Sequence, residues 1–191
     1  MEVTVNKVLD AKGLACPMPI VKTKKEMTTL EPGQVMEIQA TDKGSIADLK
    51  AWAQSTGNQY LGTVEESNVL KHYLRKASAE EEKAGVKYPD VVSLDDLLKN
   101  LEGNEKITIL DVREPAEYAF GHIPSSINIP LGELESRFEE IQSAENLHVI
   151  CRTGNRSDFA AQKLTERGFK EVKNVVPGMK EWTGPIRKEI N

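Results

Sequence analysis

Short apolar segments alternate with helix-forming stretches over the second half of this chain, and this alternation is the sequence feature that most restricts its fold. Four segments have the length and composition of buried strands: 107–110, 127–129, 147–150 and 172–176. Helices are predicted between them, at 114–119, 131–141 and 157–167. Such alternation is typical of a parallel sheet, whose ligands bind beyond the carboxyl ends of the strands. The second half therefore predicts an α/β domain with a central parallel sheet flanked by helices.

The first half of the chain predicts a different architecture. Strands are expected at 3–5, 35–40, 60–64 and 69–74. One helix is expected before the stop at Pro32-Gly33, and a second helix carries Leu49 and Ala53 on one face. The resulting order is β-α-β-α-β-β. With two helices for four strands, we expect a two-layer sandwich in which the helices cover one face of a single sheet.

A polar segment separates these two regions. Residues 78–89 are rich in charge, contain Gly85 and Pro89, and show no core periodicity. The acidic excess of the chain also lies mostly beyond this segment. We therefore expect an N-terminal domain at 1–78, a linker at 79–87 and a second domain at 88–191.

Charge and hydrophobicity exclude several classes of protein. The net charge of −5 and the isoelectric point near 5.4 argue against broad nucleic-acid binding, which needs a basic face. The N-terminus has no signal-peptide pattern, and no apolar run approaches the length of a membrane span. We expect a cytoplasmic protein that binds neither nucleic acid nor membranes.

Only two cysteines, Cys16 and Cys151, occur in the 191 residues. Two cysteines make no disulfide framework, so free thiols in a reducing compartment are expected. The three histidines, His72, His122 and His148, stand far apart in the sequence and show no paired spacing for zinc. We expect neither a metal nor any other cofactor.

Cys151 stands where a nucleophile is expected. It follows the apolar segment 147–150 and precedes the predicted helix at 157–167. Converging backbone N–H groups, the positive end of the helix dipole and the side chains of Arg152 and Arg156 all favour its thiolate. Gly154 is free to take a positive φ, so the loop can curl its N–H groups around an anion.

The spacing of this loop bears on which anion it holds. In the Cys-x5-Arg pattern of tyrosine phosphatases the cradle suits a phosphoryl group, but here Arg156 is the fifth residue after Cys151 and Ser157 takes the position of that arginine. The cradle is one residue shorter. A smaller nest suits a single sulfur atom carried on Cys151 as a persulfide, and disfavours a phosphatase or arsenate reductase.

The second half resembles single-domain rhodaneses from about Tyr88 to the C-terminus. The motifs that carry the resemblance are 151–157, Asp111-Val112-Arg113-Glu114, Glu117-Tyr118, Gly121-His122-Ile123-Pro124, Ile127-Asn128-Ile129-Pro130 and 177–182. The resemblance implies a sulfurtransferase that uses thiosulfate or a persulfide, with Cys151 becoming persulfidated. It also implies that Asp111 and Arg113 support the active loop, and that the loop binds the substrate through Arg152, Thr153, Gly154, Asn155, Arg156 and Ser157.

Cys16 stands just before the first helix, at its N-cap or one residue earlier. Pro17 suits a first helical turn, and the helix dipole is expected to favour a thiolate here too. The pattern Asp10-x-x-Gly13-Leu14-x-Cys16-Pro17-x-Pro19 resembles the TusA, or SirA-like, sulfur carriers. This resemblance implies that Cys16 accepts a persulfide sulfur and hands it on, on a surface that docks to partner proteins.

Together these features predict a two-domain sulfurtransferase that moves sulfane sulfur from a small anionic donor to Cys151. The sulfur then passes to Cys16 or to an external thiol or sulfur-carrier protein. The sequence leaves open the identity of the sulfur donor and acceptor, transfer within one chain or between two, and the oligomeric state. The alternatives are a non-catalytic interaction module of sulfur metabolism and a cysteine-based phosphatase or arsenate reductase.

Overall fold

A computed structural model describes residues 3–78, 87–103 and 106–190 of the chain. The chain divides into two compact units, Met1–Ser78 with Glu189–Asn191 and Ala79–Lys188. Each unit has a sheet and an apolar core of its own. Apart from Lys87, the linker predicted at 79–87 lies outside the described residues.

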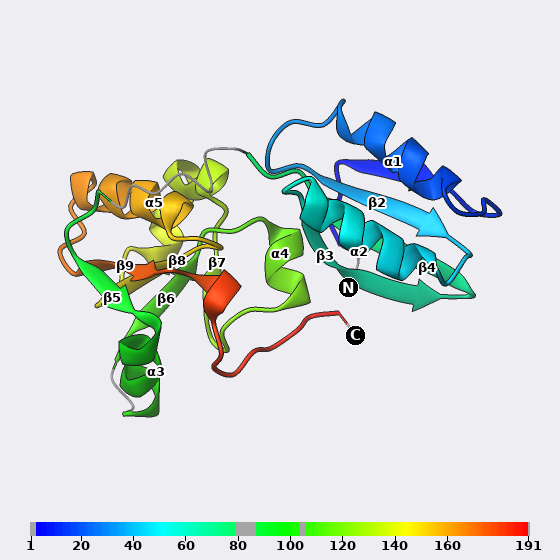
Figure 1. The fold of residues 1–191 in the computed structure, drawn as a ribbon. Coiled ribbons are helices and arrows are strands. Elements are labelled where there is room, and N and C mark those ends of the chain that lie inside the picture. The colour runs from blue at the N-terminus through cyan, green and yellow to red at the C-terminus, as the bar shows by residue number, and fades with distance from the viewer. Residues whose placement is uncertain (1–2, 79–86, 104–105, 191) are drawn as a thin grey trace. The chain divides into compact units, whose positions relative to one another are not determined.

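The first unit has the predicted order of elements (Figure 1). They are β1 (Lys7–Asp10), α1 (Met18–Met27), β2 (Val35–Ala40), α2 (Ser45–Ser55), β3 (Gln59–Glu66) and β4 (Val69–Arg75). The sheet order is β1-β2-β4-β3, with β1 parallel to β2 and the other neighbours antiparallel. Helices α1 and α2 lie together on one face of this sheet. The two-layer sandwich expected from the sequence is confirmed.

The core of the first unit lies between the two helices and the sheet. It is made by apolar side chains with at most 5% exposure, among them Met27, Leu30, Met36, Ile38, Leu49, Ala53 and Leu74. Burial of each large side chain contributes about 1.5–3 kcal/mol. The first strand was expected at 3–5, which is wrong: Lys7 pairs with Met36 at the start of the ladder. Residues 3–5 would have to pair with residues before Val35, where the chain turns.

The second unit has a sheet of five strands, all of them parallel to their neighbours, in the order β5-β9-β8-β6-β7 (Figure 1). The strands are β5 (Val91–Ser93), β6 (Thr108–Asp111), β7 (Ile127–Asn128), β8 (Leu147–Ile150) and β9 (Val172–Val176). The α-helices are α3 (Leu94–Glu102), α4 (Pro115–Phe120) and α5 (Asn155–Glu166). Three short 3₁₀ helices are η1 (Leu131–Ser136), η2 (Phe138–Ile141) and η3 (Met179–Glu181). The predicted α/β domain with a central parallel sheet is confirmed.

Three details of the second unit differ from the sequence-based expectation. The stretch 131–141 forms two 3₁₀ helices rather than one α-helix, because Arg137 leaves the helical region with φ −119° and ψ 15°. Helix α5 begins at Asn155, so Arg156 and Ser157 belong to its first turn. The edge strand β5 was missed, since three residues with only Val92 buried give no readable alternation.

Strand β8 lies at the centre of the sheet and leads directly into the loop 151–157. All four of its residues are buried, and β6 and β9 flank it. Apolar side chains from β6 and α5, including Leu110 and Leu164, pack in the same cluster as Cys151. The carboxyl end of β8 therefore delivers Cys151 directly into the interior, at the start of α5. No helix among the described residues has the length and apolar character needed to cross a bilayer.

Candidate active site

Cys151 is the first residue after β8, and its side chain is completely buried, with 0% exposure. Two hydrogen bonds reach its sulfur: Gly154 N donates over 3.1 Å and Ser157 Oγ donates over 3.3 Å. The first donor comes from the loop and the second from the first turn of α5. Donors that face a sulfur favour its anionic form. The structure thus places at the thiol two residues, Gly154 and Ser157, that the sequence analysis named as substrate-binding.

Gly154 makes this geometry possible through its backbone. It caps α5 with φ +90° and ψ −14°, in the left-handed region that glycine adopts without strain. A Cβ at this position would lie 3.1 Å from Val176 Cγ1. A side chain here would therefore strain the backbone and press on β9.

The segment after β9 holds the outer side of the loop. Met179 N donates to Cys151 O over 2.8 Å, and Lys180 N donates to Arg152 O over 3.0 Å. Gly178, at φ +104°, approaches so closely that a Cβ would lie 2.6 Å from Cys151 O. The sequence analysis named 177–182 only as part of a family resemblance. The Pro177-Gly178 dipeptide signals a turn, but its contact with residue 151 is a long-range property.

Arg156 was expected to bind the sulfur donor, and the structure gives its guanidinium a protein partner. Arg156 Nη1 and Nη2 donate to the two carboxylate oxygens of Glu117 over 2.8 and 3.0 Å. Glu117 lies on α4 with a fully buried side chain, and the Arg156 side chain is 11% exposed. Such a bidentate buried pair fixes the first turn of α5 against α4. Glu117 was not singled out as a site residue, because its partner lies 39 positions away.

Asp111 and Arg113 form the pair that the sequence suggested. The Arg113 guanidinium donates to both carboxylate oxygens of Asp111, with distances of 2.6 to 3.0 Å, and also to Gly121 O over 2.8 Å. Both side chains are almost completely buried. The pair closes the turn after β6, the strand next to β8.

The remaining loop residues, Arg152, Thr153 and Asn155, are half-buried. Arg152 Nη1 is itself buried and has no hydrogen-bond partner within the described part of the chain. A buried guanidinium nitrogen without an acceptor is costly, so an anion would satisfy it. Thr153 and Asn155 each interact with other groups of the protein.

Cys16 differs from Cys151 in almost every respect. It is exposed and stands one residue before Pro17, which caps α1. A hydrogen bond to the Asp48 carboxylate, and the negative charges of Asp48 and Asp42, raise the pKa of the Cys16 thiol. The expectation that the helix dipole favours a thiolate here is therefore wrong. Asp48 lies in the first turn of α2, so the carboxylate that faces Cys16 comes from the other helix of this unit.

The three histidines occupy separate structural positions. His72 is fully buried, and its ring nitrogens bond to Ser45 Oγ at 2.9 Å and Thr63 Oγ1 at 2.8 Å. His122 stacks on Tyr118, with ring centroids 3.7 Å apart, and His148 bonds to the carbonyl of Asn146. Among the described residues, no cluster of three or more His, Cys, Asp or Glu side chains is arranged to hold a metal ion.

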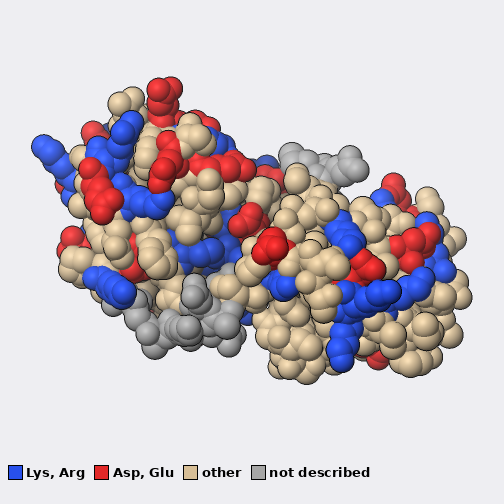
Figure 2. Space-filling model, turned by 90° about the horizontal axis from the view of Figure 1, so that it is seen from above, with Lys and Arg blue, Asp and Glu red and all other residues tan. Residues whose placement is uncertain are grey.

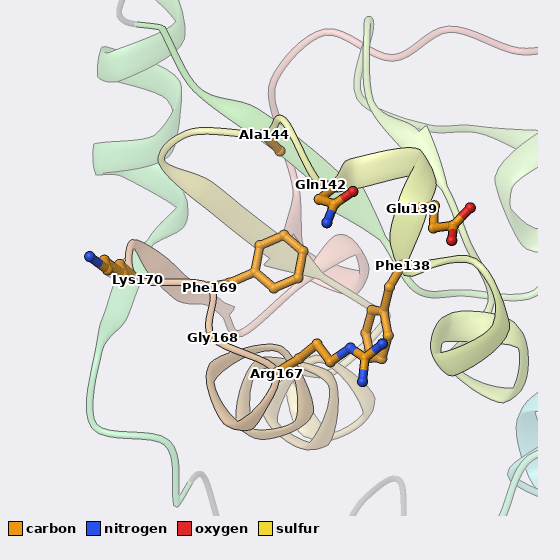
Figure 3. A pocket seen from close by; sticks show the side chains of 8 residues that line it. All are labelled: Phe138, Glu139, Gln142, Ala144, Arg167, Gly168, Phe169 and Lys170. Carbon is orange, nitrogen blue, oxygen red and sulfur yellow. The ribbon is translucent and has the colours of Figure 1, made fainter.

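A cavity of about 400 Å³ opens at the far end of α5 from Cys151 (Figure 3). Its lining residues come from η2 and from the chain that follows α5: Phe138, Glu139, Gln142, Ala144, Arg167, Gly168, Phe169 and Lys170. The Arg167 guanidinium lies 5.5 Å from the centre of the Phe138 ring. None of these residues belongs to the loop 151–157, so this cavity is separate from the thiol.

Figure 2 shows one face of the molecule, over which Lys and Arg side chains are interspersed with Asp and Glu.

Comparison with known proteins matches the two units separately and the chain as a whole. The family model "Sulfurtransferase TusA" matches residues 7–76, and the model "Rhodanese-like domain" matches residues 93–185. "Putative sulfur carrier protein YrkF" of Bacillus subtilis is 52% identical over 177 residues, which are 93% of this chain and 95% of that protein.

Two further matches concern the second unit. "Putative sulfurtransferase YtwF" of Bacillus subtilis is 37% identical over 91 residues, 48% of this chain and 87% of that protein. Among solved structures, a rhodanese-related protein of Thermoplasma volcanium is 35% identical with a TM-score of 0.47, covering 51% of this chain and 97% of that one.

Proposed function

The chain belongs to the family of proteins that join a TusA domain to a rhodanese-like domain, a family of sulfur transfer, and we propose that Cys151 is its sulfur-accepting nucleophile. Cys151 takes sulfane sulfur from thiosulfate or a persulfide donor and holds it as a persulfide. The sulfur then passes to Cys16 or to an external thiol. The two free thiols fit a reducing compartment such as the cytoplasm.

The observation that carries this proposal is the pair of hydrogen bonds to Cys151 Sγ. Gly154 N and Ser157 Oγ lie 3.1 and 3.3 Å from the sulfur and can stabilise negative charge on it. With thiosulfate, the thiolate attacks the outer sulfur, the S–S bond of the donor breaks, and sulfite leaves with the electron pair. The same donors then face the sulfur chain of the persulfide product.

Arg152 supports an anionic sulfur donor. Its buried Nη1 has no acceptor among the described residues, whereas the Arg156 guanidinium is already bound to Glu117. Arg152 is therefore the arginine of the loop with a free hydrogen-bonding position. We infer that Arg152 contacts the donor directly and that Arg156 holds the loop in place through Glu117.

Full burial of Cys151 adds a requirement to the reaction. A thiol with 0% exposure cannot meet thiosulfate or a second thiol without movement of the groups that cover it. Each transfer of sulfur to or from Cys151 therefore requires a prior movement that exposes its sulfur.

Cys16 suits the role of the carrier thiol. It is exposed, so a partner protein can reach it without rearrangement. For the second transfer, the Cys16 thiolate attacks the outer sulfur of the Cys151 persulfide, and Cys151 leaves as a thiolate with the electron pair of the S–S bond. The Asp48 carboxylate raises the pKa of the Cys16 thiol, and the proton of this thiol goes to solvent before the thiolate attacks.

Intact-mass analysis tests the proposal. The wild-type protein and the Cys151→Ser and Cys16→Ser variants are incubated separately with thiosulfate, polysulfide and glutathione persulfide. We expect a gain of about 32 Da per sulfur in wild type and in Cys16→Ser, and none in Cys151→Ser with thiosulfate. No sulfur on Cys151 with any of the three donors would reject the proposed function, and turnover of p-nitrophenyl phosphate would replace it with phosphatase chemistry.

A further inference from the structure

Asn174 is a polar side chain in the middle of the apolar strand β9. It is 0% exposed, and its neighbours across the sheet are Val91 on β5 and Val149 on β8. Its Nδ2 donates to Gly154 O over 3.1 Å, while its buried Oδ1 has no hydrogen-bond partner within the described residues. Burying an amide with half of its capacity unused costs free energy. A valine would fit the pattern of the strand better, so stability alone does not account for Asn174.

The loop carbonyls are anchored on the side away from the thiol. Cys151 O and Arg152 O accept from the backbone of Met179 and Lys180, and Gly154 O accepts from Asn174. Gly154 O also accepts from Asp158 N over 3.1 Å, the first backbone hydrogen bond of α5. A carbonyl oxygen has two lone pairs, so Asp158 N and Asn174 Nδ2 together fill its accepting capacity. Asn174 supplies the second of these two donors through a side chain.

Gly154 is held through both of its backbone polar groups. Its N–H is bound to Cys151 Sγ, and its C=O accepts from Asp158 N and from Asn174 Nδ2. Glycine has the widest choice of backbone conformations. Holding the carbonyl restrains ψ, which is −14°, whereas the N–H that meets the sulfur belongs to the preceding peptide.

The Ser157 hydroxyl gives Asn174 a second effect. Ser157 Oγ lies 3.3 Å from Cys151 Sγ and 3.1 Å from Gly154 O. A hydroxyl has one proton, so it can donate to the sulfur or to the carbonyl but not fully to both. When Asp158 N and Asn174 Nδ2 occupy both lone pairs of Gly154 O, the Ser157 proton is left for the sulfur.

We propose that Asn174 is a positioning residue of the sulfur-transfer site, which together with Asp158 N occupies the Gly154 carbonyl and so directs Ser157 O–H to Cys151 Sγ. The inference rests on the proposed role of Cys151 as the sulfur-carrying thiol. It assigns Asn174 no contact with the sulfur donor. Its effect is expected on the chemical step, with little effect on donor binding.

A double-mutant cycle in the Cys16→Ser background tests this assignment. Asn174→Leu removes the amide at nearly constant shape, and Ser157→Ala removes the hydroxyl. We expect Asn174→Leu to lower kcat for thiosulfate-dependent thiocyanate formation about tenfold, with KM changed less than threefold, because one bond to a charged sulfur is lost. In the Ser157→Ala background Asn174→Leu should lower kcat less than threefold. The reason is that loss of Asn174 acts by letting the Ser157 hydroxyl donate to Gly154 O, and this hydroxyl is then absent.

Asn128→Leu is the matched control. Asn128 Nδ2 donates to Asp111 O and Arg113 O over 2.9 Å, so this variant also loses a side-chain anchor of backbone carbonyls in the same sheet. We expect comparable destabilisation and a change in kcat below threefold. Equal loss of kcat in both asparagine variants, or additive effects of Asn174→Leu and Ser157→Ala, would overturn the proposal.

The rate at which iodoacetamide alkylates Cys151 provides a reading that needs no sulfur donor. In the Cys16→Ser background only Cys151 can react, and Asn174→Leu should change this rate several-fold relative to Asn128→Leu. If wild type takes up no sulfur, the proposed function fails, while equal alkylation rates in the two asparagine variants would still remove Asn174 from the site. If Asn174→Leu does not fold, Asn174→Ala, which adds no bulk, is measured in its place. Failure of both to fold, with Asn128→Leu folded, would assign Asn174 to stability and overturn the inference.

Discussion

The two cysteines stand at the same kind of junction, just ahead of a helix, yet their surroundings are opposite. Cys151 is fully buried and accepts hydrogen bonds from Gly154 N and Ser157 Oγ, whereas Cys16 is exposed and has the Asp48 carboxylate nearby, which raises the pKa of its thiol. Hydrogen-bond donors stabilise a charged sulfur, and a nearby carboxylate stabilises the neutral thiol. A position ahead of a helix is therefore not enough to make the two cysteines alike. At Cys151 the helix start itself supplies the donors, whereas at Cys16 a carboxylate from another helix faces the thiol.

This contrast fits a division of labour in which Cys151 makes and holds the persulfide and Cys16 exchanges it with other molecules. The largest effects that test this division of roles are expected when each thiol is removed in turn. Cys151→Ser should abolish thiosulfate-dependent thiocyanate formation, a loss of at least a thousandfold, because the nucleophile is gone. Cys16→Ser should retain this reaction within about threefold, since cyanide can take sulfur from Cys151 directly. Comparable losses in both variants would contradict the division.

The second prediction concerns the close approach of Gly178 to the Cys151 loop. Gly178→Ala places a Cβ 2.6 Å from Cys151 O, while Gly168→Ala, also at positive φ, meets nothing within 4 Å. Both variants carry backbone strain of about 1–3 kcal/mol, because an alanine rarely adopts a positive φ. Overpacking should cost Gly178→Ala about 1–3 kcal/mol more, together with most of the sulfurtransferase activity. Denaturant unfolding and thiocyanate formation measure these effects, and equal unfolding free energies for the two variants would contradict the packing of the loop.

The third prediction separates the two units by pH. Burial lowers the pKa of His72 in the first unit to about 4. The unfolded chain, with a histidine pKa near 6.5, then binds the proton first, so the unfolding free energy should fall as pH drops from about 6.5 to 4. The slope is at most about 1.4 kcal/mol per pH unit. His72→Gln should flatten this dependence for the transition of the first unit, and an unchanged slope would show that His72 is not its cause.

The smallest expected effect is at Asp48. Asp48→Asn removes the carboxylate whose hydrogen bond and charge raise the pKa of the Cys16 thiol, so that pKa should fall. More thiolate is then present at pH 7, and alkylation of Cys16 by iodoacetamide should be several-fold faster in a Cys151→Ser background. Asp10→Asn is the control on the same unit, because Asp10 does not contribute to the shift of Cys16. Equal rates in the two variants would remove Asp48 from the account.

The sequence predicted the parts of the molecule whose signals are local. The order of elements in the first unit and the parallel sheet of the second follow from short apolar runs separated by helix-forming stretches. Cys151 and Gly154 could be recognised because nucleophile, glycine and helix start lie within a few residues. The turn pair of Asp111 and Arg113 is also local, and the structure contains it.

The parts that could not be predicted depend on contacts between distant segments. Arg156 pairs with Glu117, Gly178 packs on Cys151 O, and Asn174 holds Gly154 O; none of these contacts has a short-range pattern. The expectation of a dipole-stabilised thiolate at Cys16 was wrong for the same reason. It considered the helix that follows Cys16 and not the carboxylate of Asp48 from another helix.

Time-resolved mass spectrometry of the wild-type protein tests the central claim most directly. The protein is mixed with thiosulfate labelled in its outer sulfur, and the label on Cys151 and on Cys16 is followed in peptides from rapidly quenched samples. The account predicts label first on Cys151, then on Cys16, and none on Cys16 when Cys151 is replaced by Ser. Label on Cys16 that appears at the wild-type rate in Cys151→Ser would contradict it.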